Sequence, residues 1–242
     1  MYVVEHSDGL LLIDAGQDRQ SVTDRRRYYP RGPLGWIYGR LGRFDIGSDE
    51  TLVAGLRALG HSAGDVTHVI VTHLHQDHMG CIGDLPNARV LVADAEWRAA
   101  VRAGSVLEGY LRRHIELPGV RWERLALEAA APAAASPFER AHDVFGDGAV
   151  LVLPTPGHSP GSVSVLVTAT GIPPLLFVGD LTFDLDVFDQ GKVPGVGDAK
   201  ALQASSEAVR GLRERHPELA ILPAHDPAAA GALARATGGV RR

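Results

Sequence analysis

The sequence predicts an α/β protein whose strands end at metal-binding side chains. Short runs rich in Val, Ile and Leu predict buried strands, and three amphipathic stretches predict helices that would cover the sheets. Four of the apolar runs lead directly into His or Asp residues. Loops at the ends of strands are where rigid scaffolds present chemistry, so we expect these side chains to converge at one sheet edge. The four runs are residues 69–72, 151–153, 175–178 and 220–222.

The other elements follow from turn and capping residues. Residues 3–13 predict a hairpin around Ser7-Asp8-Gly9, because this triplet combines turn residues with apolar flanks. Three amphipathic helices are expected to cover the sheets. They lie at about residues 49–59, 95–103 and 199–216, where Asp94 and Asp198 cap the last two and Gly60, Gly104 and Pro217 end them. The Ala- and Pro-rich residues 129–137 predict an extended connector, and residues 238–242 a disordered tail.

The first ligand cluster places four metal-binding side chains in six residues: His73, His75, Asp77 and His78. In an extended chain the first three share one face, whereas His78 needs a turn to point elsewhere. A helical zinc-protease motif has its two histidines at i and i+4, and that spacing does not occur here. This one segment is therefore expected to serve two metal ions.

Three more candidate ligands follow the later strands, namely His158, Asp180 and His225. Seven groups delivered from four strands are enough to hold two metal ions. The remaining six of the eleven histidines lie in turns, at helix ends or in polar surroundings, where a solvated or packing role is the ordinary one. Among these six, His6 and His68 are the candidates for supporting the ligands.

These residues resemble the metallo-β-lactamase superfamily. The motif His73-x-His75-x-Asp77-His78, followed by His158, Asp180 and His225, is similar to the seven ligands of that family in their order. Residues 12–16 and 155–162 are similar to two further family motifs. The resemblance implies an αββα sandwich, in which two mixed sheets pack face to face with helices outside. It also implies that His73, His75 and His158 bind one metal, that Asp77, His78 and His225 bind the other, and that Asp180 bridges both.

Nitrogen and oxygen ligands of this kind suit two Zn²⁺ ions, and Fe, Mn or Co also fit. Composition agrees with one domain over residues 1–242. The net charge of −5 and the absence of a dense cationic run argue against nucleic acid as a partner. The lone Cys81, the lack of a signal peptide and the lack of a long apolar run predict a cytoplasmic protein that does not enter a membrane.

Two insertion-like segments, residues 18–46 and 104–145, are the candidates for substrate specificity. The first carries Trp36 and Tyr38 among Gly, Pro and Arg, and both segments are rich in aromatic residues. One interpretation is an apolar lid over the metals that suits an acyl or aryl group of a small-molecule substrate. The alternative is that these aromatic residues pin loops to the core or form the contact of a homodimer.

A narrower resemblance concerns the substrate. Residues 179–183 and 190–195 are similar to the branch that contains N-acyl-homoserine lactonases, which implies a quorum-quenching hydrolase of lactones or esters. In such an enzyme Asp77 would carry a proton as well as bind metal. Phe183 departs from the branch, where a tyrosine is common at this position, and it is expected to remain a wall of the pocket. The alternatives are a glyoxalase II-like thioesterase, a β-lactamase-like enzyme, a phosphodiesterase or a metal-binding protein without catalysis.

Overall fold

The computed structural model describes residues 1–41 and 44–238. Internal contacts divide the chain into two units. The first unit comprises Met1–Leu91 and Ala100–Glu123, and the second comprises Val92–Ala99 and Arg124–Arg242. The prediction of a single domain stays a prediction. The tail predicted at residues 238–242 falls almost wholly outside the described residues.

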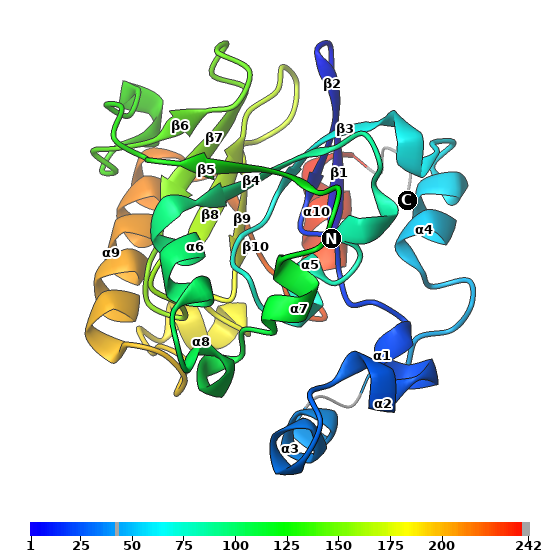
Figure 1. The fold of residues 1–242 in the computed structure, drawn as a ribbon. Coiled ribbons are helices and arrows are strands. Elements are labelled where there is room, and N and C mark those ends of the chain that lie inside the picture. The colour runs from blue at the N-terminus through cyan, green and yellow to red at the C-terminus, as the bar shows by residue number, and fades with distance from the viewer. Residues whose placement is uncertain (42–43, 239–242) are drawn as a thin grey trace. The chain divides into compact units, whose positions relative to one another are not determined.

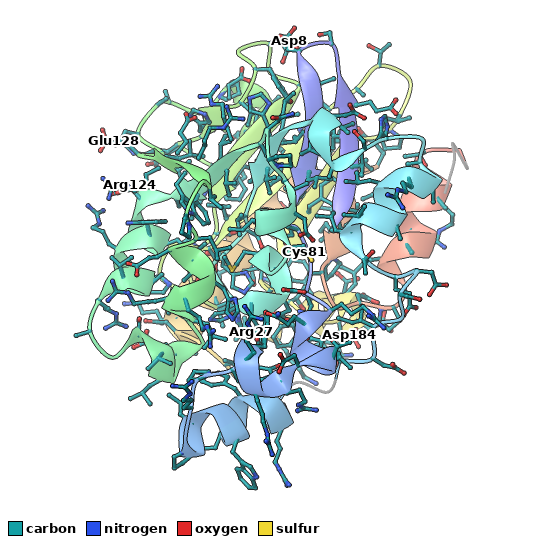
Figure 2. All side chains as sticks on the ribbon, turned by 45° about the vertical axis from the view of Figure 1, so that its right-hand side comes forward. Asp8, Arg27, Cys81, Arg124, Glu128 and Asp184 are labelled. Atoms are coloured by element: carbon teal, nitrogen blue, oxygen red, sulfur yellow. The ribbon has the colours of Figure 1, made fainter. Side chains whose placement is uncertain are left out.

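The first sheet has five strands in the order β1-β2-β3-β4-β5 (Figure 1). Strands β1 and β2 form the predicted hairpin, with Asp8 at its tip (Figure 2), and β3 and β4 then add in parallel. Gly9 is required at the turn, because a Cβ there would lie 2.1 Å from Thr67 Oγ1. The strands are Tyr2–His6, Gly9–Ile13, Val66–Ile70, Arg89–Ala93 and Arg121–Leu125.

The second sheet lies within the second unit and has the order β10-β9-β8-β7-β6. Its β9 and β10 are parallel and the other pairs are antiparallel, so both sheets of the protein are mixed. Helix α9 covers one face, where its Leu202, Val209 and Leu212 join a buried cluster with side chains of β7, β8, β9 and β10 (Figure 1). The predicted α/β class, with two mixed sheets and flanking helices, is confirmed. From β6 to β10 the strands are His142–Asp143, Val150–Pro154, Val163–Val167, Leu175–Gly179 and Ala220–Pro223.

The three predicted long helices are present. Helix α9 begins after Asp198, whose carboxylate accepts the Ala201 amide as expected of an N-cap. Helix α4 begins later than predicted, because its N-cap is Thr51, whose hydroxyl accepts the Ala54 amide. The helices outside the 18–46 segment are α4 Leu52–Ala58, α5 Gln76–Met79, α6 Asp94–Val101, α7 Arg112–Ile115, α8 Leu185–Asp189, α9 Ala199–Arg215 and α10 Ala229–Ala236; four short 3₁₀ turns lie at Ala63–Asp65, Ile82–Asp84, Ser105–Glu108 and Ala133–Ala135. Among the described residues no helix has the length and apolar character needed to cross a bilayer.

The segment of residues 18–46 is largely helical where it is described. It contains α1 Gln20–Thr23, α2 Arg25–Tyr28 and α3 Pro33–Leu41. Its aromatic residues Tyr28 and Tyr29 are buried together with Leu111 of the 104–145 segment, so the first unit joins the two predicted specificity segments. His114 stacks on the Tyr28 ring at 4.2 Å, and its Nε2 lies 2.9 Å from the Tyr28 carbonyl oxygen.

We expect the buried His114 to make the first unit less stable in mild acid. Burial lowers the pKa of His114, so the unfolded chain takes up this proton first as the pH falls. Protonation of His114 therefore does not lower the free energy of unfolding above about pH 6.5. Below that value the free energy of unfolding falls with the pH, until the pKa of His114 in the folded protein is reached. Urea unfolding of the wild type and of His114→Gln at pH 7.5 and 5.5 measures this, and the variant should lose less stability between the two values.

His68→Gln serves as a control, because its effect on the pH dependence of stability should be smaller than that of His114→Gln. Burial also lowers its pKa, but the side chain is less buried than that of His114. His68→Gln should therefore remove a smaller part of the pH dependence. If the wild type and His114→Gln lose equal stability between pH 7.5 and 5.5, His114 is not the group that causes the loss of stability in acid.

Candidate metal centre

The first ligand set lies in the first unit, directly after β3. His73 and His75 occupy the loop that follows the strand, and Asp77 and His78 lie in the short helix α5. An extended chain through Asp77, in which His73, His75 and Asp77 would share one face, does not form. The amides of His78 and Met79 both bond to the His75 carbonyl oxygen, so the chain turns into a helix directly after His75.

The spacing of the histidines in this set suits a metal ion. His73 Nε2 and His75 Nδ1 are 3.1 Å apart, close to the roughly 3.3–3.4 Å that separates two nitrogen ligands of a tetrahedral zinc ion. The ring centroids of His73 and His78 are 4.0 Å apart. His73 is wholly buried, and His78 is almost so. Buried imidazole groups gathered this closely are typical of metal ligands.

Hydrogen bonds at the opposite ring nitrogens fix the orientation of these histidines. His75 Nε2 lies 2.9 Å from the Glu108 carbonyl oxygen, and His78 Nδ1 lies 2.8 Å from Asp14 Oδ2. His73 Nδ1 lies 3.2 Å from Thr72 Oγ1. Metal-binding histidines commonly donate their second N–H group to a carboxylate or carbonyl in this way. The ring nitrogens on the opposite sides, which are the candidates for metal binding, are Nε2 of His73, Nδ1 of His75 and Nε2 of His78.

Asp14, in the segment 12–16 that resembles a family motif, has a supporting role that its sequence context does not specify. It follows β2 with a φ of 58°, which is uncommon for a residue other than glycine. Its carboxylate accepts the Thr72 amide at 2.7 Å and the Thr72 hydroxyl at 2.9 Å, in addition to the contact with His78. The supporting role expected of His6 is wrong, because His6 lies at the hairpin turn and β2 separates it from Asp14. His68 instead contacts the Thr67 hydroxyl.

The second ligand set lies in the second unit and centres on Asp180, which directly follows β9. Its Oδ2 atom is 3.4 Å from His158 Nε2, and its Oδ1 atom is 3.3 Å from His225 Nε2. Each carboxylate oxygen therefore faces a different histidine, at the distance expected for two ligands of one metal ion. Asp180 and His158 are buried, whereas the His225 side chain is 42% exposed.

Phe183 stands beside both histidines of the second set. Its ring meets His158 edge to face at a centroid distance of 5.9 Å and His225 at 5.8 Å. The side chain remains 36% exposed. The phenyl ring is thus accessible next to two candidate ligands, but it has no group that can donate a hydrogen bond.

Two tyrosine hydroxyls of the first unit are engaged elsewhere. Tyr28 is wholly buried, and its hydroxyl accepts the Gln17 side-chain amide at 2.8 Å. The Tyr38 hydroxyl donates to the Val106 carbonyl oxygen. Burial raises the pKa of both groups, so both stay protonated at neutral pH. Trp36 lies on α3 with 62% of its surface exposed and the Arg40 guanidinium 4.1 Å above its ring.

Cys81 does not contribute to either set. It is buried in the first unit (Figure 2), and burial raises the pKa of its thiol to about 12. The thiolate is the form of cysteine that binds metals and reacts. The chemistry of the two sets is therefore that of imidazole and carboxylate groups, and these donor types fit a dinuclear metal site.

Known proteins share this sequence pattern. Residues 1–225 match the family model described as the metallo-beta-lactamase superfamily. The N-acyl homoserine lactonase AttM of Agrobacterium fabrum is 31% identical over 231 residues, which cover 93% of this chain and 81% of AttM. A probable metallo-hydrolase of Mycobacterium tuberculosis, Rv2300c, is 32% identical over an alignment that covers 93% of this chain and 73% of the relative.

Solved structures share the fold. The AiiA protein of B. thuringiensis, solved as a mutant with N-decanoyl-L-homoserine at its active site, matches with a TM-score of 0.73 and 21% identity. This match covers 95% of the present chain and 82% of AiiA. Because the family model spans nearly the whole chain and carries both ligand sets, the protein belongs to the metallo-β-lactamase superfamily.

Proposed function

We propose that the protein is a dinuclear metal hydrolase that opens lactones or cleaves carboxylic esters, with N-acyl-homoserine lactones as the first candidate substrates. The observation that carries the proposal is the position of Asp180, whose two oxygens face His158 and His225 separately. A carboxylate in this arrangement is suited to bridge two metal ions. The first unit adds histidines whose rings are already oriented by hydrogen bonds.

The proposed assignment of ligands to the two metal ions follows the order of the family and takes residues from both ligand sets. His73, His75 and His158 would bind the first metal, and Asp77, His78 and His225 the second, with Asp180 shared. Zinc suits these ligands, although Fe, Mn and Co also accept imidazole and carboxylate. When bound, two such ions supply an activated water at neutral pH and polarise the carbonyl of the substrate.

The residues of the chain have separate tasks in this proposal. Asp77 is the catalytic candidate, because its side chain is a quarter exposed and its Oδ2 lies 3.9 Å from His78 Nε2. In this position it can carry a proton to the departing alkoxide as well as bind metal. Asp14 keeps His78 in the tautomer that leaves Nε2 for the metal.

A relative, the apolar side chains and the charge of the protein support the proposed substrate class. AttM, at 31% identity, is named as an N-acyl homoserine lactonase. Phe183 offers an exposed apolar ring directly beside His158 and His225. Trp36 and Tyr38, on α3 of the first unit, are the candidates for the remaining walls of the acyl pocket. The formal charge of −5 also favours a small neutral substrate over nucleic acid.

If Trp36 contributes to an acyl pocket, Trp36→Ala should raise KM more for long-chain substrates than for short ones. A buried methylene is worth about 0.8 kcal/mol, so each methylene that loses its contact weakens binding about fourfold. KM is measured for a series of lactones of increasing chain length. Leu59→Ala, which truncates an exposed apolar residue outside both specificity segments, is the matched control. A uniform change across chain lengths would favour a structural or dimer-contact role for Trp36.

A hydrolysis screen tests the proposed function. The zinc-loaded protein is assayed with lactones, aryl esters, β-lactams, glutathione thioesters and bis-aryl phosphates, and Asp180→Ala is the inactive reference. We expect lactones or esters to be cleaved with the highest kcat/KM. Preferential cleavage of thioesters or phosphodiesters would contradict the proposed substrate class while leaving the hydrolase chemistry in place.

A further inference from the structure

Glu96 is a wholly buried carboxylate in the first turn of α6, within the second unit. Burial of a charged group is costly unless hydrogen bonds compensate for the lost water. Glu96 Oε2 accepts the Ser159 hydroxyl at 2.6 Å and the Gly161 amide at 3.0 Å. Both donors belong to the loop that carries His158, and Ser159 is the next residue in the chain.

The loop of residues 155–162 is closed by its own hydrogen bonds. The Thr155 amide bonds to the Ser162 carbonyl oxygen, and the Gly157 amide bonds to the Ser159 carbonyl oxygen. The Ser162 hydroxyl lies 2.7 Å from that of Ser159, so the Glu96 carboxylate reaches both serines through one hydrogen-bonded chain. A displacement at Ser159 is thereby transmitted to the backbone on either side of His158.

Helices α6 and α9 both contact this loop. On the α9 side, the Asp198 amide donates to the Gly157 carbonyl oxygen at 2.8 Å, and the Ser205 hydroxyl donates to the Pro156 carbonyl oxygen at 2.7 Å. On the α6 side, a Cβ on Gly161 would lie 2.0 Å from the Glu96 backbone nitrogen. Helix α6 therefore rests directly on the loop, and Glu96 is the side chain that joins them.

We infer that Glu96 is a positioning residue that fixes the direction of the His158 imidazole toward its metal ion. The carboxylate neither touches substrate nor replaces a ligand. It holds the residue after His158, so that Nε2 stays beside Asp180 Oδ2. The inference rests on the proposed metal centre, and it does not depend on which substrate is hydrolysed.

The geometry of the two bonds predicts which substitutions preserve the function. Both donors meet the same oxygen, Oε2. Glu96→Gln keeps an acceptor there and should preserve the conformation of the loop. Glu96→Asp is one methylene too short to reach the two donors, and Glu96→Leu has no acceptor. The matched control is Asp143→Leu, because the Asp143 carboxylate likewise holds two backbone amides, those of Gly146 and Gly148, at the other end of β7.

The test is metal retention in protein reconstituted with Co²⁺, followed by its absorption during titration with a chelator. His158→Ala identifies the equivalent of metal that depends on His158. Glu96→Leu and Glu96→Asp should release that same equivalent at 10- to 100-fold lower chelator concentration, which is the usual effect of removing a group that orients a ligand. Glu96→Gln and Asp143→Leu should match the wild type.

Wild-type retention of the His158-dependent equivalent in both Glu96→Leu and Glu96→Asp would overturn the inference. If Glu96→Leu does not fold, the comparison of Glu96→Asp with Glu96→Gln decides, since these variants keep a polar side chain. A wild type that binds both metals yet hydrolyses neither lactone nor ester would contradict the proposed function alone. The metal readout would still show whether Glu96 positions His158.

Discussion

Asp180→Ala is expected to lower kcat/KM for the best lactone or ester by on the order of a thousandfold. The carboxylate faces His158 and His225 with separate oxygens, so its loss removes a ligand from both proposed metal sites. Metal ions contribute several kcal/mol to the stabilisation of such transition states, and each 1.36 kcal/mol is a factor of ten in rate. Steady-state kinetics measure the loss of activity of the purified variant, and elemental analysis measures its loss of metal.

Asp184→Ala is the matched control for this prediction. The Asp184 carboxylate accepts the amides of Asp186 and Val187 and caps helix α8, four residues after Asp180. Its removal should cost about 1 kcal/mol of stability and leave kcat/KM nearly unchanged. Comparable activity of Asp180→Ala and the wild type would show that Asp180 does not bridge catalytic metals.

Phe183→Tyr is expected to raise kcat/KM on an N-acyl-homoserine lactone by on the order of a hundredfold. Phe183 lies beside two ligand histidines without a donor, and the hydroxyls of Tyr28 and Tyr38 are already hydrogen-bonded. One donor directed at a developing oxyanion is worth roughly 3 kcal/mol. The comparison is made on a homoserine lactone and on a simple aryl ester.

The change in kcat/KM of Phe183→Tyr on each of the two substrates shows whether Phe183 marks a missing donor. An increase confined to the homoserine lactone would mean that Phe183 marks a missing donor and that less polar lactones or esters are the better natural substrates. Phe183→Leu, which removes the ring without adding a hydroxyl, should lower the rates on both substrates if the ring is a pocket wall. Unchanged or lower rates of Phe183→Tyr on the lactone would refute the missing-donor hypothesis.

The ligand pattern was readable from the sequence because it is local. Each of β3, β7, β9 and β10 is a short apolar run, and the candidate ligands follow within a few residues. The hairpin of β1 and β2 and the cap of α9 at Asp198 are equally local, since turn and capping chemistry is set by a few adjacent side chains. The strands, the hairpin and the cap were predicted and are confirmed, and the metal-binding role of the residues after the strands stays a prediction.

The supporting residues were not readable, because they act across long stretches of sequence. Asp14 bonds to Thr72 and His78, which are 58 and 64 residues away, and its left-handed φ leaves no mark in the sequence. Glu96 meets Ser159 at a separation of 63 residues and would pass as a surface residue at the start of a helix. Only the fold reveals that these carboxylates are buried.

The helices of the specificity segments were missed for a different reason. Helices α1 and α2 have four residues each, and α3 contains Gly35 and Gly39, which lower helix propensity. In α3 both glycines are buried, whereas Trp36 and Ile37 face outward, so the helix lacks the usual pattern of buried apolar side chains. Helix α5 has only four residues, and the alternation of its ligands with those of the preceding loop gives no helical periodicity that would predict it.

The metal content and activity of the purified protein test the central claim most directly. Elemental analysis should give two equivalents of zinc or a related divalent metal per chain, and the same sample should hydrolyse a lactone or carboxylic ester. Removal of both metals by a chelator should abolish hydrolysis, and added Zn²⁺ should restore it. One tightly bound iron per chain, together with dioxygenase activity and no hydrolysis, would contradict the account.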